Sequence, residues 1–499
     1  MIKICGQSLW CKILEIGVIL TLGTTLVFPT EKTLAQNTTP PPNQPPIPER
    51  PRQPPLPIPQ PLPQPPLEIP PPTLPGTEGR PEIPGSITVS RFEFNGNTAF
   101  SDRELSQILA PFTQRPISFA ELLQAEAAIT KQYLEKGYVN SGAIILAGQA
   151  LPQQGAVVKI QIIEGGVEEI QISGTKRLKP NYIRSRLKLA TAKPLNQRRL
   201  LQAMQVLQLD PLIQSISADL SAGSRPELSV LTVRIKEAKS FKAEFFADNN
   251  RTPSVGSFRR GVRVSEGNVL GFGDRFTLEY ANTTGSNAMN MSYTMPVNAR
   301  NGTISLSGGF SFTNVIEKPF DILDIAGNSY SVDLSFRQPI VQTATREFAV
   351  GVTASRQESH TTLLGENFQL SPGADASGTT RVAALRFFQD WTQRGPKDVF
   401  AVRSQFNVGL GILDATTNPE PPDSRFFGWR GQAQYVRLLA PDTLIVFRTD
   451  LQLAAGALVP LEQFALGGQQ SVRGYRQDAL LTDNGISASA EIRLPILRV

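Results

Sequence analysis

Residues suited to catalysis are sparse in this chain of 499 residues. It has one histidine, His360, and two cysteines, Cys5 and Cys11. A transition-metal site or a histidine-based nucleophilic centre needs several such groups close together. The sequence also lacks a Gly-x-Ser-x-Gly elbow and a phosphate loop that ends in Gly-Lys-Ser or Gly-Lys-Thr. We therefore expect no enzyme activity, no metal and no cofactor, and we expect His360 to lie in a solvated loop.

An arginine near the end of the chain is a better candidate for polar chemistry. Residues 466–476 read LGGQQSVRGYR, and glycine at this density marks backbone that needs positive φ or a close approach to another segment. Hydrophobicity alternates on both sides, over 443–458 and 486–497, so we predict a long loop between two strands. Long ordered loops of this kind are usually functional.

Four neighbouring residues of this loop carry specific expectations: Val472, Arg473, Gly474 and Tyr475. The Arg473 guanidinium can hold a carboxylate through two parallel hydrogen bonds, which would fix the loop in place. Gly474 would permit tight backbone beside it, and Tyr475 is expected to pack against a neighbouring wall. The sequence does not identify the acidic partner of Arg473. Simple anchoring of the loop is the alternative to a direct part in function.

Two further glycines, Gly467 and Gly468, are the other special backbone positions of the loop. The overall charge gives no reason to expect nucleic acid as a partner. The chain has 49 basic and 43 acidic residues, a formal charge of +6, and no dense basic run.

The first 84 residues are expected to precede the folded domains. Residues 1–35 combine basic residues, a mostly apolar run and a small-residue cleavage site, which predicts a secretory signal peptide. A retained membrane anchor is the alternative, but the run is shorter than the roughly 20 residues of a spanning helix. Cleavage near Ala35 would remove both cysteines and leave no disulfide. Residues 36–84 are rich in proline and nearly uncharged, which predicts a semi-rigid linker.

Two small α+β modules are predicted to follow, over residues 87–164 and 165–237. In the first, a strand and a glycine turn precede a short helix that Ser101 caps, a longer helix that Ser118 begins, and two strands. The same strand–helix–helix–strand–strand order occurs again in the second. Gly96 and Gly174 occupy corresponding turns, so we interpret the pair as a tandem duplication.

Residues 240–499 are predicted to form a β-barrel in a membrane. Segments of about ten to fourteen residues alternate apolar and polar side chains between turns, which is typical of transmembrane strands. A soluble β-sandwich, with shorter strands, is the alternative. We predict twelve strands: 241–248, 258–266, 272–284, 289–298, 303–315, 330–342, 346–359, 379–393, 399–412, 427–440, 443–458 and 486–497.

The sequence Val-Arg-Gly-Tyr at 472–475, preceded by QFALGG at 463–468, resembles the signature loop of Omp85-superfamily barrels. It is most similar to that of the two-partner secretion transporters (TpsB), the haemolysin secretion/activation family ShlB/FhaC/HecB. The order and turns of the two modules resemble POTRA domains, which that family carries as a pair before its barrel. The resemblance extends from about residue 87 to the end of the chain.

This resemblance implies a POTRA pair followed by an antiparallel transmembrane β-barrel in a Gram-negative outer membrane, with the POTRA domains in the periplasm. The family's barrel has sixteen strands, and its signature loop joins the eleventh to the twelfth. With about twelve strands here, we expect a C-terminally truncated barrel without the strand whose aspartate normally pairs with the loop arginine.

The function that the resemblance implies is two-partner secretion. The POTRA domains would capture an unfolded, exported partner, a secreted β-helical protein of the TpsA type, and the barrel would pass it outward without ATP. The expected groove lies between the helix 118–136 and the strand 142–146, and its candidate residues are Tyr133, Ile144 and Leu146. Ordinary core positions are the alternative for these three. Outer-membrane lipid, and the barrel-assembly machinery for the chain's own insertion, are the other expected partners.

Three other functions remain open from the sequence. An Omp85-type factor would assemble or insert other outer-membrane barrels, but such factors usually carry more POTRA modules. A passive porin would need no POTRA pair. A truncated, non-functional barrel is the third alternative.

Overall fold

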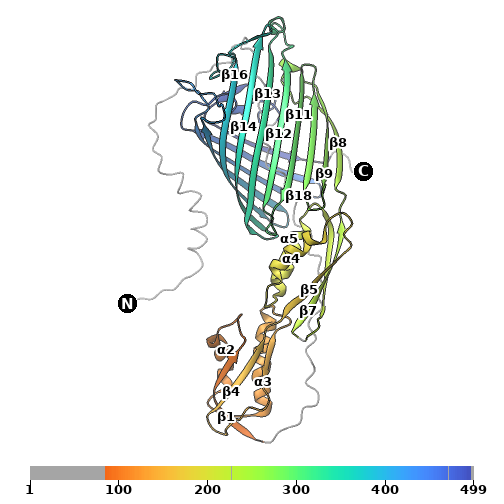
Figure 1. The fold of residues 1–499 in the computed structure, drawn as a ribbon, viewed down its shortest axis with the longest axis vertical. Coiled ribbons are helices and arrows are strands. Elements are labelled where there is room, and N and C mark those ends of the chain that lie inside the picture. Colours follow the sequence, from red (N-terminus) through yellow and green to blue (C-terminus); the bar gives the residue numbers. More distant parts are fainter. Residues whose placement is uncertain (1–84, 226, 470, 496–499) are drawn as a thin grey trace, which may run out of the picture. The chain divides into compact units, whose positions relative to one another are not determined.

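The structure, a computed structural model, describes residues 85–225, 227–469 and 471–495. The expected signal peptide and proline-rich linker lie outside these residues. Two α+β modules and one large β-sheet make up the described chain (Figure 1). Within these ranges, every helix is too short or too polar to cross a membrane.

The first module has the strand–helix–helix–strand–strand order that the sequence predicts, with one short extra strand. Its sheet has the order β2-β1-β4-β3, with β1 parallel to β4 and β3 antiparallel to β4, so β3 is an edge strand. The elements are β1 (Ser86–Asn95), α2 (Asp102–Leu109), the 3-10 helix η1 (Ala110–Phe112), β2 (Pro116–Ser118), α3 (Phe119–Glu135), β3 (Gly142–Ile145) and β4 (Ala156–Ile163).

The second module repeats this topology. Its sheet has the order β5-β7-β6, with β5 parallel and β6 antiparallel to β7. The elements are β5 (Gly166–Ser173), α4 (Pro180–Ala190), α5 (Gln197–Gln208), β6 (Ile213–Ala222) and β7 (Leu228–Glu237).

The predicted helix starts in the first module, at Ser101 and Ser118, are confirmed. The Ser101 and Ser118 side chains each accept from the backbone three residues on, and Glu104 and Glu121 accept from the cap backbone in return. Gly137, with φ of 91°, follows the last turn of α3.

The turns that suggested a duplication have the same construction in both modules. Gly96 and Gly174 have φ of 88° and 83°. A Cβ at Gly96 would lie 2.6 Å from the carbonyl oxygen of Ile162, and one at Gly174 would overlap the carbonyl oxygen of Ile235. Each turn therefore requires glycine, both for its backbone angle and for its close approach to the last strand of its module.

A glutamate two residues after that carbonyl completes the turn in each module. In the first module, the Glu164 carboxylate accepts hydrogen bonds from the backbone N–H groups of Thr98 and Ala99, at 2.6 and 2.7 Å. In the second, Glu237 accepts from the backbone N–H groups of Lys176, Arg177 and Leu178. The carboxylate satisfies donors that no neighbouring strand reaches.

Each module has its own hydrophobic core between its helices and one face of its sheet. Fully buried members in the first module include Leu105, Ile129, Tyr133 and Val158. In the second module they include Ile183, Leu187, Leu200, Met204 and Val233.

All twelve strands predicted from the alternating pattern are present in the described part of the chain. Each pairs antiparallel with the next in sequence, which gives one curved sheet with β8 and β22 at its edges (Figure 1). They are β8 (Phe241–Asp248), β9 (Arg259–Gly267), β10 (Arg275–Asn282), β11 (Ser286–Pro296), β12 (Thr303–Asn314), β13 (Ala326–Gln342), β14 (Arg346–Leu363), β16 (Thr379–Arg394), β17 (Asp398–Leu410), β18 (Phe427–Ala440), β19 (Thr443–Ala454) and β22 (Gly485–Arg493). Short elements in the loops are η2 (Pro253–Val255), η3 (Phe320–Leu323) and β15 (Glu366–Asn367), which pairs with β14.

The large sheet is apolar on the outside and polar on the inside. Large side chains are exposed at alternate positions of β12 and β13, except that Gly308 interrupts the series on β12, and the residues between them are small or polar. The exposed residues are Ile304, Leu306, Phe310 and Phe312 on β12, and Tyr330, Val332, Leu334 and Phe336 on β13. Buried positions include Ser311, Ser329, Gln405 and Asn407. A water-soluble sheet would place these residues the other way round, so this arrangement fits a wall whose outer face meets lipid.

Candidate functional site

A loop between the eleventh and twelfth strands of the large sheet, residues 455–484, lines the space inside that sheet. We call it the lumen loop. Its own short strands β20 (Phe464–Leu466) and β21 (Leu480–Thr482) pair with each other. Together with inward side chains of most strands from β9 to β22, it lines a cavity of about 1010 Å³. The predicted position of the loop, between strands eleven and twelve, is confirmed.

Four arginines on the cavity wall form ion pairs with carboxylates of adjacent strands. Arginines and carboxylates alternate in ion pairs: Arg259–Asp248, Arg263–Glu279, Arg430–Asp450 and Arg448–Glu491. Pairing of opposite charges avoids a large local field of either sign in a wet lumen.

The base of the lumen loop is held by a buried ion pair. Arg386 on β16 donates from Nη1 to Oε2 of Glu462 at 2.9 Å and from Nη2 to Oε1 at 2.6 Å. Both side chains are nearly inaccessible, with 8% and 7% of their surface exposed. Arg386 also donates to Ser355 Oγ and Asn407 Oδ1, each at 3.1 Å, so neighbouring strands fix its orientation.

An apolar contact beside this ion pair strengthens the attachment. Val459 of the loop is fully buried against Val382 and Ala384, which lie on the same face of β16 as Arg386. Phe464 is also buried, and a Cβ at Gly485 would overlap its ring. The loop base therefore packs into the wall through side chains on both sides of Glu462.

The tip of the loop is held more weakly. Arg473 Nη2 donates to Oε1 of Glu491 on β22 at 2.8 Å, and the arginine side chain is 64% exposed. Glu491 is therefore the acidic partner of Arg473 that the sequence did not identify. The same carboxylate also pairs with Arg448 and Arg493. The expected two-point contact of Arg473 is not formed, because a single carboxylate oxygen serves both Arg448 and Arg473.

The glycines of the loop have the backbone conformation that we expected, whereas Tyr475 does not pack as we expected. Gly467, Gly468 and Gly474 all have positive φ, at 115°, 88° and 91°. The expected packing of Tyr475 is wrong, since its side chain is 68% exposed. The adjacent Arg476 pairs with Glu317, which lies in the loop between β12 and β13.

The edge strand of the first module carries the candidate groove residues. Ile144 and Leu146 are 47% and 45% exposed, beside an edge strand that pairs with a neighbour on one side only. The assignment of Tyr133 to the groove is wrong, because Tyr133 is fully buried. Its ring contacts those of Phe100 and Tyr138 edge-on in the core.

Tyr133 belongs instead to the hydrogen-bond network of Glu164. Its hydroxyl donates to Glu164 Oε1 at 2.9 Å, and Thr98 Oγ1 donates to the other oxygen. Burial alone would raise the pKa of the Glu164 carboxyl, but the hydrogen bonds from Thr98, Ala99 and Tyr133 outweigh burial and lower that pKa. Burial and the adjacent carboxylate raise the pKa of Tyr133, so its hydroxyl remains protonated and can donate.

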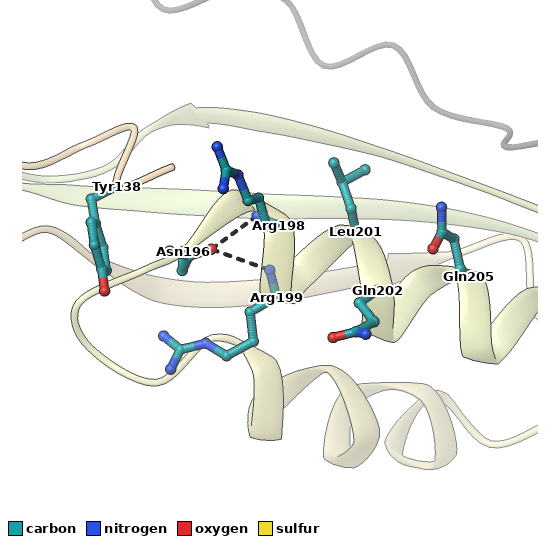
Figure 2. A pocket seen from close by; sticks show the side chains of 7 residues that line it. All are labelled: Tyr138, Asn196, Arg198, Arg199, Leu201, Gln202 and Gln205. Atoms are coloured by element: carbon teal, nitrogen blue, oxygen red, sulfur yellow. Dashed lines mark hydrogen bonds between the residues drawn. The ribbon is translucent and has the colours of Figure 1, made fainter. Parts of the chain in front are cut away.

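A second hollow, of about 640 Å³, lies at the start of α5 (Figure 2). Asn196 caps this helix by accepting from the backbone N–H groups of Arg198 and Arg199. The Arg198 and Arg199 guanidiniums already donate to the carbonyl oxygens of Glu135, Ala192 and Pro194. These arginines join chain segments through backbone carbonyl groups.

His360 lies in a strand and not in the solvated loop that we expected. The strand β14 continues four residues past the predicted end, and His360 Nδ1 lies 2.9 Å from Thr379 Oγ1 of β16, the strand with which β14 pairs. Within the described ranges, no three His, Cys, Asp or Glu side chains gather in a way that could hold a metal ion.

Sequence reasoning missed Glu164, Arg386 and Glu462. The available signal is a charge next to large apolar residues. Glu164 follows Ile162 and Ile163, and Arg386 lies between Leu385 and Phe387. Their partners lie 66 and 76 residues away, so the pairing itself depends on the fold.

Two protein-family models match the chain. Residues 227–499 match "Haemolysin secretion/activation protein ShlB/FhaC/HecB", and residues 87–165 match "POTRA domain, ShlB-type". The outer membrane transporter CdiB of Dickeya dadantii (strain 3937) is 23% identical over 427 residues, which span 82% of this chain and 74% of the relative. The heme/hemopexin transporter protein HuxB of Haemophilus influenzae (strain 86-028NP) is 21% identical over 415 residues, or 79% and 70% of the two chains.

Solved structures have the same fold. CdiB from Escherichia coli superposes with a TM-score of 0.65 at 19% identity, covering 85% of this chain and 79% of the other. CdiB from Acinetobacter baumannii gives 0.57 at 17% identity, with 83% and 78% covered.

Proposed function

This chain belongs to the haemolysin secretion/activation family ShlB/FhaC/HecB, and on that premise we propose that its POTRA modules capture an exported partner protein that its β-barrel then passes outward. The expected fold, a POTRA module followed by a large antiparallel sheet like that of CdiB, is confirmed. The chain is a transporter of the outer membrane, and its POTRA region lies in the periplasm. It acts in secretion or activation, as two-partner secretion transporters do.

We divide the chain into a signal peptide (1–35), a proline-rich linker (36–84), two POTRA domains (87–164 and 165–237) and the barrel (240–499). The repeated topology and the matching glycine–glutamate turns support two POTRA domains of similar length.

The edge strand β3 is the observation that carries the capture step. It has an unpaired side in its sheet, and Ile144 and Leu146 expose apolar surface next to it. An extended segment of an unfolded partner can add to such an edge through backbone hydrogen bonds and place alternate apolar side chains on Ile144 and Leu146. Backbone pairing makes little demand on the partner's sequence, which suits a β-rich protein presented in unfolded form.

The lumen loop defines the second step. It lines the same cavity as the inward wall residues, so a polypeptide that crosses the barrel needs the loop to move. Val472, Arg473 and Gly474 lie at the weakly held tip, whereas Glu462 lies at the firmly held base. The wall that a moving chain would meet carries small polar residues and paired charges, which bind passing peptide groups weakly.

Deletion of residues 87–164 tests this function. The deleted chain should still reach the outer membrane and show heat-modifiable migration on a gel, but the partner should accumulate in the periplasm. Normal export of the partner would refute the capture role. If the purified intact chain retained nascent barrel proteins and not an exported partner, the function would instead be barrel assembly.

A further inference from the structure

The outward backbone donors of β3 are already occupied by side chains of α3. The backbone N–H of Ala143 donates to Thr130 Oγ1, and that of Ile145 donates to Glu126 Oε2, each at 3.0 Å. On an antiparallel edge strand, backbone groups of alternate residues point toward and away from the neighbour. Because β4 is the sheet neighbour, the N–H groups of Ala143 and Ile145 are the ones that an added strand would use.

The helix presents these acceptors at a spacing close to that of a strand. Glu126 and Thr130 are four residues apart on one face of α3, which corresponds to a rise of about 6.0 Å. Alternate residues of an antiparallel strand lie about 6.8 Å apart. Two side-chain oxygens on successive helix turns therefore match two successive outward N–H groups of β3.

Gly142 permits the close approach of helix and strand. A Cβ at this position would lie 3.2 Å from both Cγ2 and Oγ1 of Thr130. A larger residue at position 142 would push against the Thr130 hydroxyl, which accepts the hydrogen bond from the backbone N–H of Ala143. The absence of a side chain at Gly142 therefore leaves room for Thr130 beside the start of the edge strand.

We propose that Glu126 and Thr130 act as an internal substitute for an incoming strand, which a captured segment must displace before it can pair with β3. The inference rests on the proposed capture function and adds the residues that regulate it. In the resting chain, the two side chains also prevent β3 from pairing with the edge of another molecule.

Displacement has a consequence for what the groove selects. The incoming segment exchanges two side-chain hydrogen bonds for two backbone hydrogen bonds, so pairing alone contributes little net affinity. The affinity must come from apolar contact with Ile144 and Leu146, which are exposed beside the edge. The groove should therefore favour extended segments with apolar residues at every second position over uniformly polar ones.

The test uses the full chain in detergent micelles and two double variants. Thr130→Val with Glu126→Met removes both acceptors at similar volume, whereas Thr130→Ser with Glu126→Gln keeps an acceptor at both positions. The probe is a labelled nine-residue peptide of alternating valine and threonine, and a version with central prolines serves as the control peptide. Hydrogen exchange in fragments that span 139–148 reports the occupancy of the β3 amides, and exchange in β1 and β4 reports that the module is folded.

The acceptor-free variant should bind the alternating peptide about tenfold more tightly than the unmodified chain, equivalent to about 1.4 kcal/mol. Its β3 amides should exchange faster without peptide and become protected with it. The conservative variant should match the unmodified chain in both measurements. Equal or weaker binding by the acceptor-free variant, or unchanged exchange in 139–148, would overturn the proposal.

The outcome is separable from that of the proposed function. If residues 87–164 prove necessary for secretion while the acceptor-free variant gains no affinity, capture stands and the displacement step is wrong. If the deletion leaves secretion intact, capture itself fails, whatever the peptide measurements show.

Discussion

Arg386 on β16 and Glu462 at the base of the lumen loop form a two-point ion pair in which both side chains are nearly buried. The arginines at the tip, Arg473 and Arg476, pair with Glu491 and Glu317 but are 64% and 61% exposed. Exposed ion pairs contribute about 0–1 kcal/mol, whereas breaking a buried one by removing one partner costs on the order of 3 kcal/mol or more. The loop is therefore held mainly at its base.

Removing one member of the buried pair should open the lumen. We expect Glu462→Ala or Arg386→Ala to raise single-channel conductance in planar bilayers, because the remaining charge is left unpaired and the loop base moves away from it. The exchanged pair Arg386→Glu with Glu462→Arg should restore part of the low conductance. Arg476→Ala is the matched control and should change conductance little. Equal opening by all single variants would contradict a dominant role of the base.

Acid should destabilise the first POTRA module through Glu164. The folded-state pKa of its carboxyl is lowered, so the unfolded state binds the proton more readily. The resulting stabilisation is present above the unfolded-state pKa and is lost as pH falls through the folded-state pKa. Glu164→Gln should lower the unfolding free energy of the module at neutral pH by about 2 kcal/mol, since hydrogen bonds to a charged group are weakened.

The measurement is urea-dependent hydrogen exchange of β1 and β4 in the intact chain, at neutral pH and at the acid end of its stable range. The unmodified chain should lose protection on acidification, and Glu164→Gln should lose much less. Glu168→Gln, a change at an exposed carboxylate of the second module, is the control and should leave the first module's acid response in place. An unchanged acid response in Glu164→Gln would place the titrating group elsewhere.

The glycine turns should tolerate no side chain. Gly96→Ala combines an unfavourable φ of 88° with a Cβ only 2.6 Å from the Ile162 carbonyl oxygen, and we expect it to lower module stability by about 2–3 kcal/mol. Gly155→Ala, also at positive φ but in open space, should cost only about 1 kcal/mol. If the two substitutions lowered the unfolding temperature equally, the cost would come from the backbone conformation alone and not from the contact with the Ile162 carbonyl.

Charge on the exposed edge of the first module should impair secretion without unfolding it. Ile144→Asp with Leu146→Asp replaces the apolar surface that we assign to the partner, and the partner's yield outside the cell should fall at least about tenfold. Leu189→Asp, at an equally exposed leucine of the second module, is the control and should secrete normally. A comparable loss from Leu189→Asp would point to a general effect of added charge.

The large sheet was predictable from sequence because its pattern is local. A strand with lipid on one face and a polar lumen on the other must alternate, so each of the twelve strands shows its period directly, as Phe310 and Phe312 do around Ser311. The strand ends were less accurate. The β14 strand includes His360 because Thr379 of β16 pairs with it, and it continues further because Gly327 and Ala326 of β13 pair with the next two residues. No local signal in the sequence reports this pairing.

The site was only partly predictable, for a related reason. The glycines of the lumen loop indicate where the loop lies and which of its residues need positive φ. The ion pairs of Arg386 and Arg473, in contrast, join residues that are distant in sequence, so they depend on how the strands pair. Tyr133 could have been placed correctly. It shares the apolar face of α3 with Leu122, Ala125 and Ile129, and that spacing already assigns it to the core.

Photocrosslinking from Ile144 tests the central claim most directly. A photoreactive amino acid at position 144 of the intact chain, activated in cells during secretion, should form an adduct with the partner, and the same residue at position 189 should form none. Such a result would locate the partner on the edge strand of the first POTRA module. Efficient secretion with no adduct from position 144 would contradict the account.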